Sequence, residues 1–386
     1  MSRSKDDFVD ISSSDQINKI YGKKRRRKGL ARRVTVLLLS IIMLLSGSAF
    51  VYYYSALDSL NFKNIDDTEE TTSDSTVSVE GASNNLLSST KVLNILLFGQ
   101  DAAASGEEKY GRSDTTILLS IDNINKKLKM TSFQRDTYVT IPGYGDNKLN
   151  AAFSLGGVSL SIKTIEANFG IKVDKYACVD FDSFREIIKV LGGVDIELTL
   201  DEIQYINAQI DVNDQTDRTK FIDYDPNLQK QKIHLDGYQA LWYARDRGAD
   251  SLGGISDYSF SGDDWDRTAR QRNLLTTIVN SLKDAPLTDL VQIVNKVGPL
   301  VTTNLKKGDI TFLVQNLISY MKYDIEQISI PVEGTWEYGV TDDGQSVIVI
   351  KDWDKVRYDL ASFIYEDSVS SSGSSSMLAT ESKTLY

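Results

Sequence analysis

Apolar and polar positions follow a regular pattern mainly between residues 91 and 365. The run VLNILLFG (92–99) is apolar almost throughout and ends in glycine, as expected for a strand buried on both faces. Residues 115–133 predict two strands joined by a polar turn. Residues 158–170 have the apolar spacing of a helix and end at Gly170, a residue typical of helix C-termini.

Strand-like and helix-like patterns alternate further along the chain. The segments are a strand YACVDF (176–181), a helix DSFREIIKVLGG (182–193), a strand VDIEL (194–198), and helices LDGYQALWYARDR (235–247) and WDRTARQRNLLTTIVNSL (265–282). Asp182 is the expected N-cap of the first of these helices. This alternation predicts an α/β fold, a three-layer α/β/α domain around a central mixed sheet, in which sites usually lie beyond the carboxyl ends of strands.

A longer apolar run precedes this domain. Residues 34–54 carry no charge in 21 positions and would span about 30 Å as a helix, which matches a bilayer core. Basic residues directly before this run predict a signal-anchor helix with the N-terminus inside and the large domain on the outer face of the cell membrane. A cleaved signal peptide is the alternative, because Gly47-Ser48-Ala49 resembles a cleavage site.

Composition divides the chain into five regions. Between the anchor and the domain, and again at the C-terminus, polar and Ser-rich segments lack an apolar pattern. The predicted regions are a cytoplasmic basic tail (1–33), the transmembrane helix (34–54), a flexible extracellular stalk (55–90), an extracellular catalytic domain (91–365) and a disordered Ser-rich tail (366–386).

The net charge of -11 is distributed unevenly. Residues 1–33 hold eleven Lys/Arg and four Asp/Glu, a net of +7, so the remainder carries -18. The single histidine, His234, excludes zinc sites built on several histidines, and we expect it to be structural or exposed to solvent. The single cysteine, Cys178, excludes an intrachain disulfide and is expected in the core, which fits the surface of a Gram-positive bacterium.

Two aspartates flank the first two predicted strands. Asp101 follows the first strand and Asp114 immediately precedes the second, so their carboxylates converge if the strands are neighbours. Two hard oxygen ligands without a nearby histidine suit Mg²⁺, or Mn²⁺ as a substitute. A turn or cap role is the structural alternative for each aspartate.

Arginines gather where an anion is expected. Residues 245–272 contain five arginines and no lysine. Because guanidinium groups bind phosphate through two parallel hydrogen bonds, whereas lysine is a solvated point charge, this choice favours a phosphate site. The alternative is a set of surface ion pairs with neighbouring aspartates, namely Asp246, Asp250, Asp263, Asp264 and Asp266.

Six ordered motifs make the chain resemble the LytR-CpsA-Psr family of membrane-anchored cell-wall ligases. They are NILLFGQD (94–101), GRSDTTILLSID (111–122), SFQRDTYVTIPGYGDNKLNAAFSLGG (132–157), VDFDSFREIIKVLGGVDIEL (179–198), LDGYQALWYARDR (235–247) and DDWDRTARQRNLL (263–275). Two departures stand out. Gln134 occupies a position where proline is usual, and the spacer from Arg247 to Arg267 is longer than in most relatives.

The resemblance implies a phosphotransferase that moves a glycopolymer from a polyprenyl diphosphate carrier to a peptidoglycan sugar hydroxyl, with an apolar cleft for the lipid. Asp101 and Asp114 match the Mg²⁺ ligands of the family. The positions that match its pyrophosphate clamp are Arg112, Arg135, Arg245, Arg247, Arg267 and Gln271, with Asp136 as a partner. Catalytic roles are implied for Arg135, Asp136, Arg245 and Arg247, whereas Arg270 and Arg272 could face acidic neighbours instead.

Two other functions remain open from the sequence. A hydrolase that cleaves the diphosphate would need the same clamp, because water and a sugar hydroxyl attack the same phosphorus. A membrane-bound regulator is the third possibility, but nucleic-acid binding normally uses an extended basic surface and the predicted outer domain is acidic. The sequence therefore predicts no nucleic-acid partner.

Overall fold

The computed structural model of the chain describes residues 86–101, 110–213, 220–248, 262–283 and 285–366. The expected basic tail (1–33) and transmembrane helix (34–54), with nearly all of the stalk and the Ser-rich tail, lie outside these residues. In the described part of the chain, no helix is long and apolar enough to cross a membrane.

A six-stranded mixed sheet lies at the centre of the domain, in the order β10-β3-β2-β1-β6-β9. Its strands are β1 (Val92–Gln100), β2 (Ser113–Asp122), β3 (Lys127–Phe133), β6 (Lys175–Asp180), β9 (Thr302–Thr303) and β10 (Asp324–Ile330). Neighbours β1 and β6, and likewise β3 and β10, are parallel, whereas β2 runs antiparallel to both β1 and β3. The predicted α/β fold with a central mixed sheet is confirmed, including the two strands within 115–133.

This topology brings several strand ends to one edge of the sheet. The carboxyl ends of β1, β3, β6 and β10 lie there together with the amino end of β2, because β2 alone of these five runs in the opposite direction. Four of the residues selected from the sequence, Asp101, Arg112, Arg135 and Asp136, lie in the loops that leave this edge, and Asp114 lies at the amino end of β2. The edge is therefore the expected location of a site.

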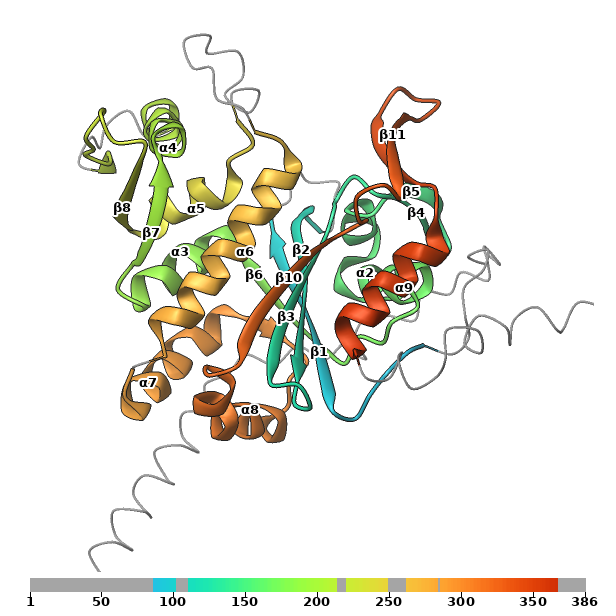
Figure 1. Cartoon of the computed structure of the whole chain (residues 1–386), viewed down its shortest axis with the longest axis horizontal. Helices are drawn as coiled ribbons and strands as arrows, with labels where there is room; N and C mark the ends of the chain where they lie inside the picture. The colour runs from blue at the N-terminus through green and yellow to red at the C-terminus, as the bar shows by residue number, and fades with distance from the viewer. Residues whose placement is uncertain (1–85, 102–109, 214–219, 249–261, 284, 367–386) are drawn as a thin grey trace, which may run out of the picture. The chain divides into compact units, whose positions relative to one another are not determined.

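Helices cover both faces of the sheet (Figure 1). They are α2 (Ala151–Phe169), α3 (Phe181–Val190), α4 (Leu200–Asn213), α5 (Gly237–Arg245), α6 (Asp264–Ser281), α7 (Leu287–Val297), the short η4 (Gly298–Leu300), α8 (Lys307–Tyr320) and α9 (Trp353–Tyr365). Helices α2 and α9 pack on one face through Ile165 and Leu360, which join Leu96 of β1 in the main core. Because side chains alternate along a strand, Leu97 points to the opposite face, toward α3, α5 and α6.

Three two-stranded antiparallel sheets lie outside the central sheet in the described part of the chain. They are β4 (Tyr138–Ile141) with β5 (Gly145–Lys148), β7 (Val194–Thr199) with β8 (Lys230–Leu235), and β11 (Trp336–Val340) with β12 (Ser346–Ile350). The predicted strand 194–198 is thus confirmed, but it pairs with β8 and not with the central sheet. Side chains of the two strands, among them Leu198 and Leu235, belong to a separate hydrophobic core. The helix that follows β6 is capped by Asp180, whose side chain accepts from the Ser183 amide at 2.7 Å, so Asp182 is not its N-cap.

The two singular residues lie where the sequence places them. Cys178 is a buried cysteine of β6. His234 is largely exposed on β8, and its Nδ1 lies 2.7 Å from Asp195 Oδ1 on the neighbouring strand β7. The buried position of Cys178 and the exposed position of His234 both agree with what the sequence predicts.

A buried ion pair supports the packing of α9 on the sheet. Lys129 Nζ lies 2.9 Å from Asp122 Oδ2 and also donates to the Ile364 carbonyl at 3.1 Å, with both charged side chains almost fully buried. We expect Lys129→Met to lower the free energy of unfolding by about 3–5 kcal/mol, because it leaves the Asp122 carboxylate uncompensated. Lys355→Ala, which breaks the exposed pair with Asp359, should cost far less, because solvent screens that pair. Urea unfolding of both variants checks this, and equal losses would contradict it.

Candidate functional site

The two predicted metal ligands lie at the same edge of adjacent strands. Asp101 directly follows β1, and its amide donates to the Arg112 carbonyl at 2.9 Å. Asp114 is the second residue of β2, where the register with β1 shifts at Gly99 and Gln100. The expected neighbouring position of the two strands is confirmed, and both aspartates lie at the edge where the carboxyl ends of β1 and β3 meet.

Arg135, just after β3, connects three carboxylates. Its Nη1 donates to Asp114 Oδ1 at 2.8 Å, and its Nε lies 3.2 Å from Asp264 Oδ1 and 3.6 Å from Asp136 Oδ2. Asp136 is also paired with Lys148 Nζ at 2.9 Å. Arg135 and Asp136 therefore lie in one charged cluster, as the motif comparison implies.

Arg267, in the first turns of α6, joins the same cluster from the opposite side. Its Nη2 donates to Asp264 Oδ2 at 2.9 Å, and its Nη1 lies 3.9 Å from Asp114 Oδ1. The side chain is only 2% exposed. Asp264 and Asp114 thus each contact both Arg135 and Arg267, so that two guanidinium groups alternate with two carboxylates.

This alternation shifts the two carboxyl groups in opposite directions. Burial alone would raise the pKa of Asp114, but Arg267, Arg135 and Arg247 outweigh it and hold that pKa below its usual value. Burial raises the pKa of Asp264 by more than Arg267 and Arg135 lower it. Burial also lowers the pKa of Arg267 to about 10, so its guanidinium stays charged at neutral pH.

Several buried polar atoms in the cluster lack a hydrogen-bond partner among the described residues. They are Arg135 Nε, Arg267 Nε, Asp264 Oδ1 and Gln271 Oε1, of which Arg135 Nε and Asp264 Oδ1 lie 3.2 Å apart as an ion pair without hydrogen-bond geometry. Nearly all buried polar groups in proteins are hydrogen-bonded, and an unmade bond costs about 1–3 kcal/mol. The buried Nε of Arg267 is therefore a cationic donor that an anionic ligand could satisfy.

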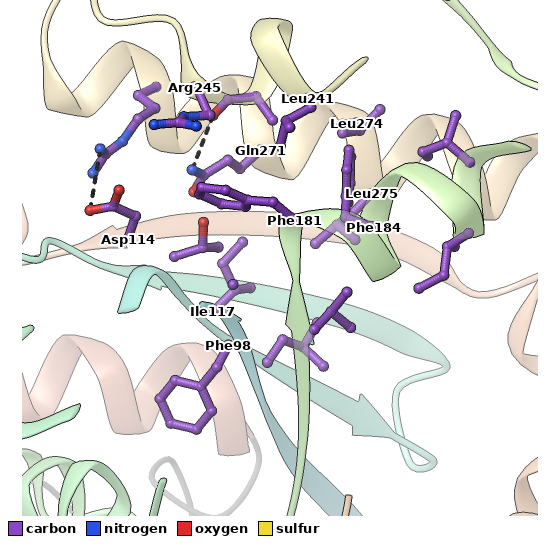
Figure 2. Close-up of a pocket in the computed structure, with 18 of the residues that line it drawn as sticks. Phe98, Asp114, Ile117, Phe181, Phe184, Leu241, Arg245, Gln271, Leu274 and Leu275 are labelled. Carbon is purple, nitrogen blue, oxygen red and sulfur yellow. Dashed lines mark hydrogen bonds and ion pairs between the residues drawn. The ribbon is translucent and has the colours of Figure 1, made fainter. Parts of the chain in front are cut away.

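The cluster opens into a mainly apolar cavity of about 280 Å³ between the sheet and helices α3, α5 and α6. Asp114, Arg245 and Gln271 lie toward one end, whereas Phe184, Leu274 and Leu275 lie toward the other (Figure 2). Arg267 and Arg247 also line the cavity. The cavity therefore joins a charged mouth to a long apolar interior, a shape suited to a ligand with an anionic head and a hydrocarbon tail.

Arg245 and Arg247 reach the mouth from the end of α5. The Arg245 guanidinium lies 4.5 Å from the Phe181 ring centroid and 5.1 Å from that of Trp242, which restrains it by cation–π contact. Gln271 Nε2 donates to the Ala244 carbonyl at 3.2 Å, so α6 and the end of α5 are bonded here. The structure brings both arginines and Gln271 together at the cavity, as predicted.

The long spacer between Arg247 and Arg267 begins and ends at the same place. Gly248 has a φ of +81°, and a Cβ on it would come within 2.8 Å of the Gly262 nitrogen. Only glycine tolerates both the backbone angle and this close approach. The two ends of the spacer, at Gly248 and Gly262, therefore lie close together.

Arg112 is the predicted clamp residue that the structure does not bring into the cluster. Its side chain is exposed and makes no ion pair with another described residue. Conversely, sequence reasoning assigned Asp264 only to surface ion pairs, whereas it is 18% exposed and joins Arg135 to Arg267. The available signal was its i,i+3 spacing from Arg267, which places the two side chains on one helix face.

Arg270 and Arg272, the two arginines of residues 245–272 that are not predicted to bind the diphosphate, have separate structural roles. Arg270 Nε donates to Glu202 Oε1 at 2.8 Å, and its Nη2 lies 3.3 Å from Asp246 Oδ2. Because Asp246 lies between Arg245 and Arg247, Arg270 fixes the segment that carries them. Arg272 instead binds neutral acceptors on β3 and β10, namely Ser132 Oγ at 2.7 Å, Ser329 Oγ at 2.9 Å and Gln327 Oε1 at 3.1 Å.

The donor set suits a metal ion only when a ligand supplies further oxygens. No group of three or more His, Cys, Asp or Glu side chains within the described residues could hold a metal by itself. Both arginine contacts to Asp114 use Oδ1, which leaves Oδ2 for another interaction. One or two carboxylates completed by water and phosphate oxygens is the usual arrangement for Mg²⁺ in phosphoryl-transfer sites, so the residues fit this ion.

Residues 50–355 match the profile of the LytR-CpsA-Psr family. The polyisoprenyl-teichoic acid–peptidoglycan teichoic acid transferase TagV of Bacillus subtilis is 32% identical over 62% of this chain and 56% of its own length. TagU of Oceanobacillus iheyensis, with the same transferase name, is 31% identical over 67% of this chain and 75% of its own. The regulatory protein MsrR of Staphylococcus aureus is 29% identical over 71% and 75% of the two chains.

Solved structures have the same fold. A structure described as TagT bound to LIIa-WTA has a TM-score of 0.54 and 26% identity, and covers 75% of this chain and 99% of that chain. The crystal structure of B. subtilis TagV has a TM-score of 0.54 and 27% identity, and covers 72% and 98% of the two chains.

Arg270 and Arg272 form a matched pair for a stability test. Burial raises the pKa of Asp246 to about 6 even though Arg270 lowers it, so the carboxylate is ionised above pH 6 and then depends on Arg270. We expect Arg270→Met to cost about 3–5 kcal/mol of unfolding free energy at pH 8, where the pairs with Asp246 and Glu202 are both lost. The cost should be lower at pH 5, where folded Asp246 is mostly protonated and only the pair with Glu202 is lost. Urea unfolding at both pH values measures this difference.

Arg272→Met is the control. It removes hydrogen bonds to neutral groups and exposes no carboxylate, so its cost should be about 1–2 kcal/mol and nearly independent of pH over this range. Equal pH dependence of the two variants would contradict the assigned pairing of Arg270 with Asp246.

Proposed function

Because the chain belongs to the LytR-CpsA-Psr family, we propose that it is a Mg²⁺-dependent phosphotransferase that joins a glycopolymer to peptidoglycan. The donor is the polymer on a polyprenyl diphosphate carrier, and the polymer is a teichoic acid or a capsular or secondary wall polysaccharide. One observation carries this proposal. Arg267, which lines an apolar cavity, keeps a buried Nε donor without a hydrogen bond beside Arg245 and Arg247, which matches the two chemical parts of a polyprenyl diphosphate.

The clamp arginines hold the diphosphate. Arg135, Arg247 and Arg267 approach from three different segments of the chain, so their donors can contact oxygens on different sides of the two phosphates. Arg245 and Gln271 face the same mouth. The polyprenyl tail then extends along Leu274, Leu275 and Phe184 into the apolar part of the cavity.

The proposed reaction exchanges the phosphoanhydride bond of the donor for a phosphoester bond to the acceptor. The acceptor hydroxyl oxygen attacks the phosphorus next to the glycopolymer, the bond from that phosphorus to the bridging oxygen breaks, and polyprenyl phosphate leaves with the electron pair. The hydroxyl proton is released, and a phosphodiester joins polymer and peptidoglycan. Arg135 and Arg267 stabilise the negative charge on the transferring and leaving phosphates, which is the main contribution expected of a protein in phosphoryl transfer.

A bound Mg²⁺ would neutralise further charge on the phosphate oxygens. Asp101 and Asp114 are the residues that would hold it, with water and phosphate oxygens as the remaining ligands. The lowered pKa of Asp114 keeps that carboxylate ionised and available at neutral pH. Mn²⁺ would fit the same oxygen ligands.

The proposed substrates require a location outside the cytoplasm. An anchor at 34–54 would place the domain on the outer face of the membrane, where a polyprenyl-linked polymer and peptidoglycan are both accessible. The proposed catalytic domain, residues 91–365, carries the clamp, and no nucleic acid is among the proposed partners. The relative named as a transferase supports this assignment, and the relative named as a regulatory protein supports the alternative of a regulator.

An Arg245→Ala, Arg247→Ala double variant tests the clamp. We expect transfer of polymer from a synthetic polyprenyl diphosphate donor to fall by on the order of 10²–10³-fold, because charge on the phosphates is no longer compensated. Arg185→Ala, which changes a partly exposed arginine of α3 paired with Asp182, is the control and should keep full activity. Undiminished transfer by a folded double variant would disprove the proposed role.

Product analysis separates the ligase from a hydrolase. With peptidoglycan present, the ligase yields polymer bound to peptidoglycan, whereas a hydrolase yields free phosphorylated polymer whether or not an acceptor is added. A regulator would yield neither product under any condition. The same assay therefore distinguishes all three functions.

Metal dependence can be measured both during transfer and, by calorimetry, without turnover. We expect EDTA to abolish transfer and Mg²⁺ to restore it, and calorimetry with a non-reactive diphosphate analogue should show Mg²⁺ binding that Asp114→Asn weakens at least tenfold. Asp195→Asn, at an exposed carboxylate of β7, is the control and should bind as the wild type does. Binding of Mg²⁺ that is unaffected by Asp114→Asn would exclude this residue as a ligand.

A further inference from the structure

Three aromatic side chains form a continuous row beside the charged cluster. The Trp265 ring of α6 stacks on Trp336 of β11 with centroids 4.9 Å apart and planes at 23°. Trp336 in turn contacts Tyr338 edge to face, with centroids 4.9 Å apart. Tyr338 is 63% exposed. We call Trp265, Trp336 and Tyr338 the aromatic row.

The row is fixed to the proposed catalytic edge from two sides. Trp265 directly follows Asp264, which contacts Arg135 and Arg267. From the other side, the Ile348 amide of β12 donates to the Asp136 carbonyl at 2.9 Å, so the hairpin that carries Trp336 and Tyr338 is bonded to the loop after β3. The hairpin stands beside β4 and β5 (Figure 1). A ligand on the row would therefore extend directly toward the clamp.

The charge around the row differs from that of the clamp. The hairpin, residues 336–350, contains three acidic residues and no lysine or arginine. Lys351, directly after it, is paired with Glu337 at 2.6 Å. At its other end the row is flanked by Asp263, Asp264 and Asp266. An anionic polymer or an anionic lipid surface is disfavoured here, whereas an uncharged ligand is not.

The chemistry of the row matches sugar rings. The face of an aromatic ring carries the negative part of its quadrupole, and the axial C–H groups of a pyranose carry partial positive charge. Neighbouring carboxylates can accept hydrogen bonds from sugar hydroxyls. Aromatic side chains also supply contact area at a low entropic cost.

We propose that the aromatic row binds the glycan strand of the acceptor and directs its hydroxyl to the phosphate held by the clamp. This assignment rests on the proposed function, because it names the place where that reaction's acceptor binds. The row also separates the two substrates by charge. The anionic donor meets the arginines, and the uncharged sugar rings meet aromatic faces between carboxylates.

The experiment uses the full chain in nanodiscs, with Tyr338→Ala as the test variant. We expect the KM for isolated glycan strands to rise about three- to tenfold, with kcat and the KM for the donor near wild-type values. Tyr338→Phe keeps the ring and should behave as the wild type. Tyr358→Ala, which removes a 46% exposed tyrosine of α9, is the matched control and should also change nothing.

A binding measurement keeps the test independent of transfer. Without donor, glycan strands should change the fluorescence contributed by Trp336, identified by comparison with Trp336→Phe, and Tyr338→Ala should weaken this binding by the same factor. If the wild-type protein shows no transfer but binds glycan strands in a way that depends on Tyr338, the proposed function is contradicted and the aromatic row remains a glycan-binding site. Glycan binding that is unchanged in Tyr338→Ala would overturn the row, even if transfer is observed.

The same nanodiscs test the competing occupant, a lipid surface. Lipids brominated in their acyl chains quench tryptophans that enter the bilayer. If the wild-type protein is quenched and Trp336→Phe is not, the aromatic row contacts the membrane and the proposal is overturned. If the wild type and Trp336→Phe are quenched equally, the proposal is supported.

Discussion

The site depends on one electrostatic constraint, which is the close approach of Arg135 and Arg267 in a largely buried location. Two guanidinium groups that are buried away from water repel each other strongly, and each loses the favourable hydration of its charge. Asp114 and Asp264 offset this by contacting both guanidinium groups, but Arg267 keeps an Nε donor without a hydrogen bond. The cluster is therefore held together without a ligand yet retains a buried donor without an acceptor, as expected of a preorganised anion site.

The rest of the fold can be understood as the support for this arrangement. The mixed sheet brings Asp114 and Arg135 to one edge because β2 runs against β1 and β3. Helix α6 connects that edge to the second core, since Leu274 packs in the core that contains β7 and β8, while Arg272 binds Ser132 and Ser329 of the central sheet. A shift of α6 would move Arg267 relative to Arg135, so its several attachments maintain the geometry of the cluster.

Elements whose patterns are local could be predicted from the sequence. The apolar run before Asp101 and the turn within 115–133 identify adjacent strands, and the apolar stripe after Arg267 identifies α6. The partners of an element and the burial of a charge depend on tertiary packing. The period of two in VDIEL indicates a strand but not that its partner is β8, and Asp180 and Asp182 are equally good N-caps until the strand end is known. Asp264 at i,i+3 from Arg267 has the spacing of an ordinary surface pair, and only the position of Arg135 makes it central.

The cluster of arginines in residues 245–272 does not serve a single purpose. Arg245, Arg247 and Arg267 line the cavity, whereas Arg270 holds Asp246 and Arg272 holds the sheet. Guanidinium suits all three tasks because its fork of donors can bind two acceptors at once, which lysine does less well. The choice of arginine over lysine is therefore a weaker sign of phosphate than the sequence alone indicates. The stronger sign is the Arg267 Nε donor, which has no hydrogen bond and lies beside an apolar cavity, because an ion-pair network with only a structural role would not require it.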